Sequence, residues 1–400
     1  MIKITTLLAC LGLAAAPEPF RIPDLNTKSE PDGIVKLPSS TARPILRVFE
    51  RGTLIRSADG DPIHILAQRG VSPLVIRQVR SALKEVLSPV PDSPWGADKR
   101  AVAQALADQP AVLMIFRSDE SVPEWRPGTL AGTKLSGMAL LADRVYLEGD
   151  PRTDVPGNPD EALAAAVRLV YEFGIADAMP EFAERLERAT QDAMRRGVLN
   201  AGAFEGHTTR QIAAIHLATA LEVSYGMWQG ADGAARGFYA PTTASELAAL
   251  DPAVADLVHQ FFLPYRPGER FVWPGFNGAY SLDSHAAPAH APRRSRIANL
   301  TLVGRLDASL EGNALDNRLA GNAGDNTFRG LGGDDVILGD KGFDTAVYRG
   351  FVDEYHVEIE GDLVFVIDLA PNRDGSDVLR DVELLRFADA EIVTDPTAEP

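Results

Sequence analysis

The stretch from Gly304 to Gly350 reads GRLDASLEGNALDNRLAGNAGDNTFRGLGGDDVILGDKGFDTAVYRG. A large apolar residue recurs in it every nine residues, and glycine and aspartate recur at the same period. A period this regular indicates stacked repeats, which settle the fold of this part of the chain. The apolar positions are Leu310, Leu319, Phe328 and Ile337, the glycines are at 312, 321, 330 and 339 with Gly304 one residue out of phase, and the aspartates are Asp307, Asp316, Asp325 and Asp334.

The residue types fit a chain that turns sharply and binds a cation. Glycine allows the positive φ angles of tight loops, and Asn313 and Asn322 also tolerate the left-handed region. Aspartates supply hard oxygen ligands, and stacked loops place carboxylates of alternate repeats around one ion. Calcium, which takes about six to eight oxygens, suits such loops. The alternative is a flexible Gly/Asp/Asn-rich linker, but the apolar residue that closes each unit argues against it.

The repeat resembles the nonapeptide of RTX proteins, Gly-Gly-x-Gly-x-Asp-x-U-x, where U is a large apolar residue. The best copy runs from Gly330 to Leu338, and a second runs from Gly321 to Phe328, whereas Leu315 replaces a glycine in an earlier unit. The resemblance implies a parallel β-roll with two or three calcium ions, followed after Asp344 by a β-rich cap. The residues that it assigns to calcium are Gly312, Asn313, Asp316, Gly321, Asn322, Gly324, Asp325, Gly330, Gly332, Gly333, Asp334, Asp335, Gly339, Asp340, Gly342 and Asp344.

The negative charge is concentrated in the repeat region. The chain has 400 residues and a net charge of −17. Residues 297–400 hold 22 acidic and 8 basic residues, a net of −14, and the remainder holds 34 and 31, a net of −3. This distribution argues against a nucleic-acid partner and favours a bound cation.

The N-terminal residues indicate export. Residues 1–16, MIKITTLLACLGLAAA, resemble a short secretory signal peptide, and Cys10 within LLAC resembles a lipidation site, so a lipoprotein signal is an alternative. Cys10 is the only cysteine, which excludes an intramolecular disulfide. Residues 17–57 begin rich in proline and predict an extended arm or linker. The repeats imply type I secretion by resemblance, and the signal implies the general route. No stretch predicts a transmembrane segment.

Residues 58–284 predict a mixed α and β domain. Its segments follow the order of the zinc-metallopeptidase domain related to anthrax lethal factor, which they resemble over about residues 62–262. The resemblance rests on a helix after ILAQRGVSPLVIRQVRSAL, a YLEGDP segment, a helix that contains YEFGIADAMPEF, and a later helix that carries Glu222. The linker at 285–297 would join this domain to the repeat domain at 298–400.

The zinc motif of that family is degenerate. Peptidases of this kind use His-Glu-x-x-His, with two imidazoles one helical turn apart and a glutamate as general base. The better register places Glu172 on the glutamate, and a second register places Ala164, Ala165 and Arg168 on the motif. Neither contains a histidine. Glu222 matches the third ligand, and Arg168 is its expected ion-pair partner, so Glu172 and Glu222 are predicted to be remnants of a zinc site.

The sequence therefore predicts a multidomain protein: an α+β metallopeptidase-like domain without catalytic residues, followed by a calcium-binding parallel β-roll with a β-rich cap. It would be a secreted or cell-surface bacterial protein whose front domain binds a protein or cell-surface partner. Two alternatives remain open. One is a secreted zinc metallopeptidase with nonstandard ligands, and the other is an adhesive or extracellular matrix protein.

Overall fold

Alternating apolar strands and capped helices build the first part of the chain, and short strands at the repeat period build the last part. The structure, a computed structural model, describes residues 22–109, 111–118, 136–151, 160–228, 237–283 and 294–394. Contacts divide the chain into two units. The front unit holds residues 1–146 and 157–264, and the coil unit holds residues 147–156 and 265–400. The predicted signal at 1–16, Cys10 and most of the predicted linker lie outside the described residues.

The front unit is built on a five-stranded sheet in the order β1-β2-β3-β4-β5. Strands β1 (Val35–Lys36), β2 (Phe49–Arg56) and β3 (Pro62–Gln68) pair antiparallel, whereas β4 (Ala111–Phe116) and β5 (Ser136–Leu141) join in parallel. Every side chain of β4 is buried, which explains its unbroken apolar run AVLMIF. Alternate residues serve two cores: Leu113 lies in the larger one, while Met114 lies in the smaller one with α1 (Arg43–Val48).

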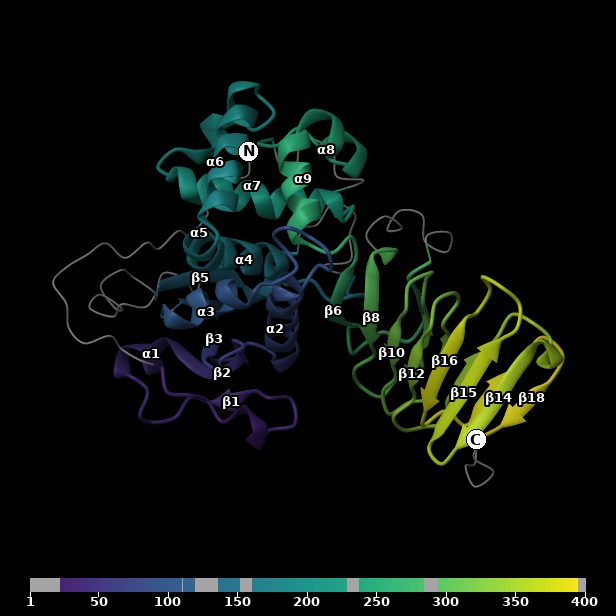
Figure 1. Ribbon diagram of the computed structural model, residues 1–400. Coiled ribbons are helices and arrows are strands. Elements are labelled where there is room, and N and C mark those ends of the chain that lie inside the picture. The colour runs from purple at the N-terminus through teal and green to yellow at the C-terminus, as the bar shows by residue number, and fades with distance from the viewer. Residues whose placement is uncertain are drawn as a thin grey trace. The chain divides into compact units, whose positions relative to one another are not determined.

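Helices cover the larger core. Ser72 caps α2 (Pro73–Leu87), Asp160 caps α4 (Glu161–Val170), and a capping box at Thr208 starts α7 (Thr209–Ser224). Figure 1 shows α4 between the sheet and a group formed by α6, α7, α8 and α9. The remaining helical segments are α3 (Arg100–Asp108), a π-helical turn (Tyr171–Ile175), α5 (Ala176–Ala178), α6 (Pro180–Arg195), α8 (Ala244–Leu250) and α9 (Pro252–Phe261).

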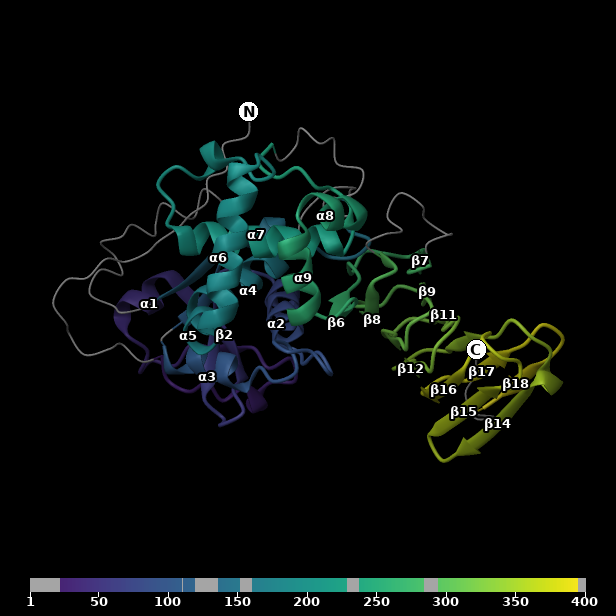
Figure 2. The same ribbon diagram turned by 45° about the horizontal axis from the view of Figure 1, so that its top comes forward.

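The coil unit consists of two facing parallel sheets whose strands alternate along the chain. One sheet contains β6 (Arg266–Phe271), β8 (Ile297–Thr301), β10 (Arg318–Ala320), β12 (Val336–Leu338) and β16 (Ser376–Arg380). The other contains β7 (Ala279–Ser281), β9 (Ser309–Glu311), β11 (Thr327–Arg329), β13 (Thr345–Val347) and β17 (Leu384–Arg386). Figures 1 and 2 together let the reader follow the two sheets. This alternation makes the unit a parallel β-roll.

The apolar repeat position forms the interior of the roll. Leu319 pairs in register with Leu300 and Ile337, 18 or 19 residues away, and Phe328 pairs with Leu310. All of these side chains are buried in one core. Each coil therefore contributes one inward side chain per strand, as the nine-residue period predicted.

Antiparallel strands and an aromatic cluster close the C-terminal end of the roll. Strands β14 (Tyr355–Glu360) and β15 (Leu363–Asp368) extend one sheet, and β18 (Glu391–Val393) extends the other. Tyr348, Tyr355 and Phe387 lie with ring centroids 5.0 to 5.4 Å apart. The predicted β-rich cap after the repeats is present.

The first coil of the roll begins before the repeats. Strands β6 and β7, and residues 147–156, belong to the coil unit although they lie within the range 58–284 expected for the front domain. These coils lack the Gly/Asp pattern, so their parallel pairing had no signal in the sequence. Both strands lie near the end of that range.

Candidate functional site

The sixth residue of each repeat lies inside the turn that joins two strands. These residues stack in two columns, one on each edge of the roll. One column consists of Asn317, Asp335 and Asp377, and the other consists of Asn326, Asp344 and Glu383. Within each column, the backbone N–H of a residue donates to the side chain of the next column member along the chain. The N···O distances are 2.7 Å (Asn317 to Asp335), 3.0 Å (Asp335 to Asp377), 2.7 Å (Asn326 to Asp344) and 2.7 Å (Asp344 to Glu383).

Two carboxylates in these columns are buried with an oxygen unpaired. Asp335 is 1% exposed and Asp344 is fully buried, and among the residues that the structure describes the Oδ2 atom of each has no hydrogen-bond partner. Burial, together with neighbouring acidic groups, raises the pKa of Asp335 and of Asp344 to about 7 and that of Asp377 to about 8. A bound cation would stabilise the ionised form of all three.

Glycine at the first position of each loop leaves room for these side chains. A Cβ atom on Gly330 would lie 2.0 Å from Oδ2 of Asp335, and one on Gly339 would lie 2.5 Å from Oδ2 of Asp344. Gly312 and Gly321 face the sixth-position amides of Asn317 and Asn326 in the same way. The four opening glycines predicted from the repeat therefore line the interior of the turns.

The predicted ligands Asp316, Asp325 and Asp334 occupy the fifth position and point elsewhere. They are exposed, and each accepts a backbone N–H from the next coil on its edge, at 2.9, 2.8 and 3.0 Å from Asp334, Phe343 and Ser376. They join neighbouring coils on the outside of the turns. Asp340, at a second position, is exposed too.

Asp377 and Glu383 complete the columns and were not predicted. They follow the β14–β15 hairpin, so Asp377 lies 42 residues after its neighbour Asp335 instead of 18. A signal existed, because Asp377-Val378-Leu379 repeats the pattern Asp335-Val336-Ile337 that precedes a strand. The inserted hairpin hid the continued period.

The front unit places an arginine beside the predicted zinc ligands. The Nε atom of Arg168 on α4 is buried without a hydrogen-bond partner in the described part of the chain. Burial lowers the pKa of Arg168, and the charges of Glu161, Glu172 and Glu222 oppose this shift. Glu222 is 1% exposed, and its Oε2 atom accepts a hydrogen bond from Nε1 of Trp228 at 3.0 Å. A guanidinium thus supplies positive charge near these carboxylates.

The predicted zinc-motif register centred on Glu172 falls on a π-helical turn whose flanking residues are buried. Tyr171 and Ile175, which take the histidine positions in that first register, are fully buried in the core. Both lie in the π-helical turn. Gly174, which also matched, has a packing role, because a Cβ atom there would lie 2.8 Å from Cγ1 of Val102 on α3.

His216 lies on α7, the helix that carries Glu222, and both of its ring nitrogens have hydrogen-bond partners. His216 is buried, with Nδ1 3.0 Å from Oγ1 of Thr190 and Nε2 2.9 Å from Oδ2 of Asp251. Within the described ranges, no group of three or more His, Cys, Asp or Glu side chains is arranged to hold a metal ion.

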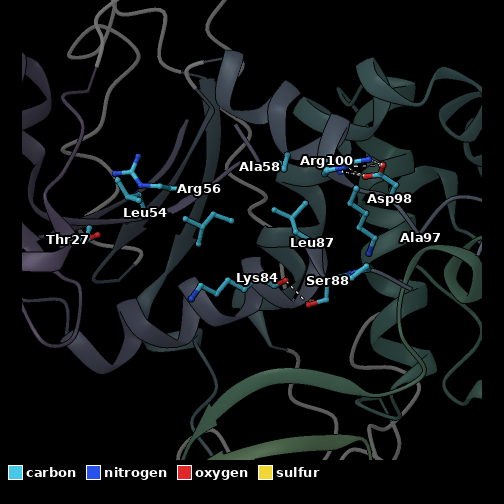
Figure 3. Close-up of a pocket in the computed structure, with 14 residues that line it drawn as sticks. Thr27, Leu54, Arg56, Ala58, Lys84, Leu87, Ser88, Ala97, Asp98 and Arg100 are labelled. Carbon is cyan, nitrogen blue, oxygen red and sulfur yellow. Dashed lines mark hydrogen bonds and ion pairs between the residues drawn. The ribbon is translucent and has the colours of Figure 1, made fainter. Parts of the chain in front are cut away.

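A basic cleft of about 830 Å³ in the front unit was not predicted. Figure 3 shows Lys84 and Ser88 on one side and Asp98 and Arg100 on another. Lys99 in the same lining is 5% exposed, and its Nζ atom donates to the Val86 carbonyl at 2.9 Å. Burial lowers the pKa of Lys99 to about 7.

Comparisons with known proteins identify the repeats. Residues 311–346 match the RTX calcium-binding nonapeptide repeat over four copies. No curated protein matches the chain. One solved structure, the extracellular lipase LipA from Serratia marcescens, has 13% sequence identity and a TM-score of 0.31. The match covers 85% of this chain and 55% of the lipase, so the chain spans about half of the lipase's length.

The chain therefore carries RTX calcium-binding repeats. A TM-score of 0.31 is too low to transfer either fold or activity from the lipase. These matches do not support the metallopeptidase resemblance of residues 62–262, which stays a prediction. No helix in the described residues has the length and apolar character needed to cross a membrane.

Proposed function

We propose that the protein is an exported calcium-binding protein whose front unit binds a partner and does not hydrolyse peptides. The observation that supports calcium binding most directly is the pair of buried, unpaired oxygens on Asp335 and Asp344 within the matched repeats. Leaving a carboxylate oxygen buried and unpaired is costly, and a cation removes the cost.

Calcium suits these turns because their available ligands are oxygens. Asp335 with Asp377, and Asp344 with Glu383, offer carboxylates on neighbouring coils, and glycine-rich turns present backbone carbonyl groups. When bound, calcium supplies the positive charge that such buried carboxylates otherwise lack. Folding of these coils would then depend on calcium, since the ion binds only the folded turns.

Arg168 supports the proposal that the front unit is inactive as a peptidase. A guanidinium cannot activate water as a zinc ion does, and its positive charge lies close to Glu222 and Glu172. The basic cleft offers a binding surface, because Lys84 has no ion pair in the described part of the chain, whereas Arg56 and Arg100 pair with Asp24 and Asp98.

One preparation tests both parts of the proposal. The purified full-length protein is dialysed first into chelator and then into calcium, and bound metals are measured by mass spectrometry with circular dichroism alongside. We expect bound calcium, a gain of β-structure with calcium, and no zinc. Absence of calcium binding would overturn the calcium function, and one zinc per chain with hydrolysis of a protein substrate would restore the peptidase alternative.

A further inference from the structure

The four repeat turns have two different backbone conformations. In the turns at 330–335 and 339–344, the second and fourth residues have positive φ: Leu331 73°, Gly333 108°, Asp340 80° and Gly342 113°. In the turns at 312–317 and 321–326, the second and fourth residues, Asn313, Leu315, Asn322 and Gly324, do not have positive φ. Asn313 and Asn322, which tolerate the left-handed region, do not adopt it here, and their side chains close the turns by hydrogen bonds instead.

Asparagine pairs close the first two turns. The Oδ1 atom of Asn317 accepts the backbone N–H of Asn313 at 2.8 Å, and its Nδ2 atom donates to Oδ1 of Asn313 at 3.2 Å. Asn326 and Asn322 repeat this arrangement at 2.9 and 3.3 Å. Second-position and sixth-position side chains thus hold each other in both turns.

The amide groups of these asparagines also satisfy backbone carbonyl oxygens. Nδ2 of Asn317 donates to the Ala298 carbonyl at 3.1 Å, and Nδ2 of Asn313 donates to the Ile297 carbonyl at 2.9 Å. In the other column, Nδ2 of Asn322 donates to the Leu306 carbonyl at 3.1 Å. A side-chain amide both donates and accepts hydrogen bonds. Its oxygen accepts as a carboxylate would, and its NH2 group contacts carbonyl oxygens as a bound cation would.

The last two turns lack any such substitute. Leu331 has no polar side chain, and Asp340 carries a second negative charge close to Asp344. Among the four repeat turns, the unpaired Oδ2 atoms of Asp335 and Asp344 therefore occur only in the two turns that have no asparagine at the second position.

Resting on the calcium function proposed above, we propose that the roll has a metal-independent half and a calcium-dependent half. Two ions bind, one at Asp335 with Asp377 and one at Asp344 with Glu383. The turns at 312–317 and 321–326 do not fit calcium, although they belong to the four matched copies, because asparagine pairs already close them. At low calcium, the first coils stay folded and form the base on which the later coils assemble.

Calcium stoichiometry tests the proposal. The full-length protein and its variants are equilibrated at a fixed free calcium concentration, and bound calcium per chain is measured. We expect two ions for the unchanged protein and one each for Asp335→Asn and Asp344→Asn. Asp307→Asn is the control, because Asp307 is exposed and accepts the backbone N–H of Asp325 in an asparagine-closed turn, and it should keep two ions.

The outcomes separate the two proposals. An unchanged protein that binds no calcium removes the proposed function itself. Four bound ions, or loss of an ion in Asp307→Asn, leaves the calcium function intact and overturns the division of the roll.

Hydrogen exchange of the unchanged protein provides a test that does not depend on any variant folding. In chelator, we expect amides of β10 and β11 to stay protected and those of β12 and β13 to exchange rapidly. Equal loss of protection in all four strands would contradict a metal-independent half.

Discussion

At the scale of single residues, Leu331 shows how a turn can depend on its ion. Its φ of 73° lies in the left-handed region, which costs a residue with a side chain about 1 kcal/mol or more. Replacing it by glycine should raise the unfolding free energy in calcium by about 1 kcal/mol, measured by denaturant unfolding. Leu315→Gly is the control, because Leu315 has no positive φ and the glycine there should destabilise.

Asn317 allows a second prediction at this scale. Its side chain makes three hydrogen bonds inside the first column, so Asn317→Ala should destabilise the roll by about 1 to 3 kcal/mol. The loss should be equal with calcium and with chelator, because no ion takes part. A loss seen only in calcium would show that Asn317 is a ligand.

The lowered pKa of Lys99 predicts that the stability of the front unit depends on pH. Its folded pKa of about 7 lies below the unfolded value of 10.5, so between these values the unfolded chain binds more protons. This term therefore increases stability as pH rises from 7 to 10.5, and its full penalty is present below pH 7. Lys99→Met should raise the unfolding free energy at pH 6 by about 1 to 3 kcal/mol and by much less at pH 10.5.

Chemical denaturation of the front unit at the two pH values measures this difference. Lys84→Met is the control, because Lys84 is exposed and should show no comparable dependence. A gain of the same size at both pH values would contradict the assigned cause, which is desolvation of the ammonium group.

At the scale of elements, substitutions on α4 can test the predicted peptidase resemblance. Ala164 and Arg168 lie four residues apart on a regular α-helix, the spacing of two zinc-binding histidines. Ala164→His combined with Arg168→His should create a zinc site with Glu222, measured by zinc content and calorimetry. The single variants are controls and should bind far less. A folded double variant without zinc would remove the reason for relating α4 to the His-Glu-x-x-His helix.

The sequence predicted elements where a single period dominates. The nine-residue repeat correctly predicted that Leu319 and Phe328 point into the roll, because the single large apolar residue of each unit can leave water only in the interior. It did not predict β6, β7 or Glu383, since pairing between strands far apart leaves no local pattern. The register at Glu172 stays a prediction, and the π-helical form of the turn there is a further feature that the four-residue spacing did not indicate.

At the scale of the whole molecule, residues 147–150 complete the first coil of the roll. Glu148 is fully buried, with Oε1 3.2 Å from Nε of Arg270, and it accepts a hydrogen bond from the Tyr280 hydroxyl. Its backbone also bonds to Phe271 and Trp273 at 3.0 and 2.8 Å. Glu148→Ala should lower the unfolding free energy of the roll by about 3 to 5 kcal/mol, because it leaves a buried arginine charge with less compensation.

Trp273, one residue beyond the bridge between Glu148 and Val272, offers a fluorescence signal for this unfolding. Asp143→Ala, an exposed change on the other side of the boundary between the units, should have little effect. Equal stability of the Glu148 variant and the unchanged protein would show that residues 147–150 are not part of the roll's stable structure.

The membership of residues 147–156 in the coil unit also governs how this protein can be made and inherited. A ribosome finishes Glu148 more than a hundred residues before it makes Arg270 and Tyr280, so the Glu148 carboxylate has neither partner until about two thirds of the chain has been made. A gene that is cut once, between residues 264 and 265, encodes a roll that lacks the segment around Glu148, which bridges to Val272. The two units are therefore expected to pass from one gene to another as a pair, and exchange of either alone would require a compensating change at Arg270.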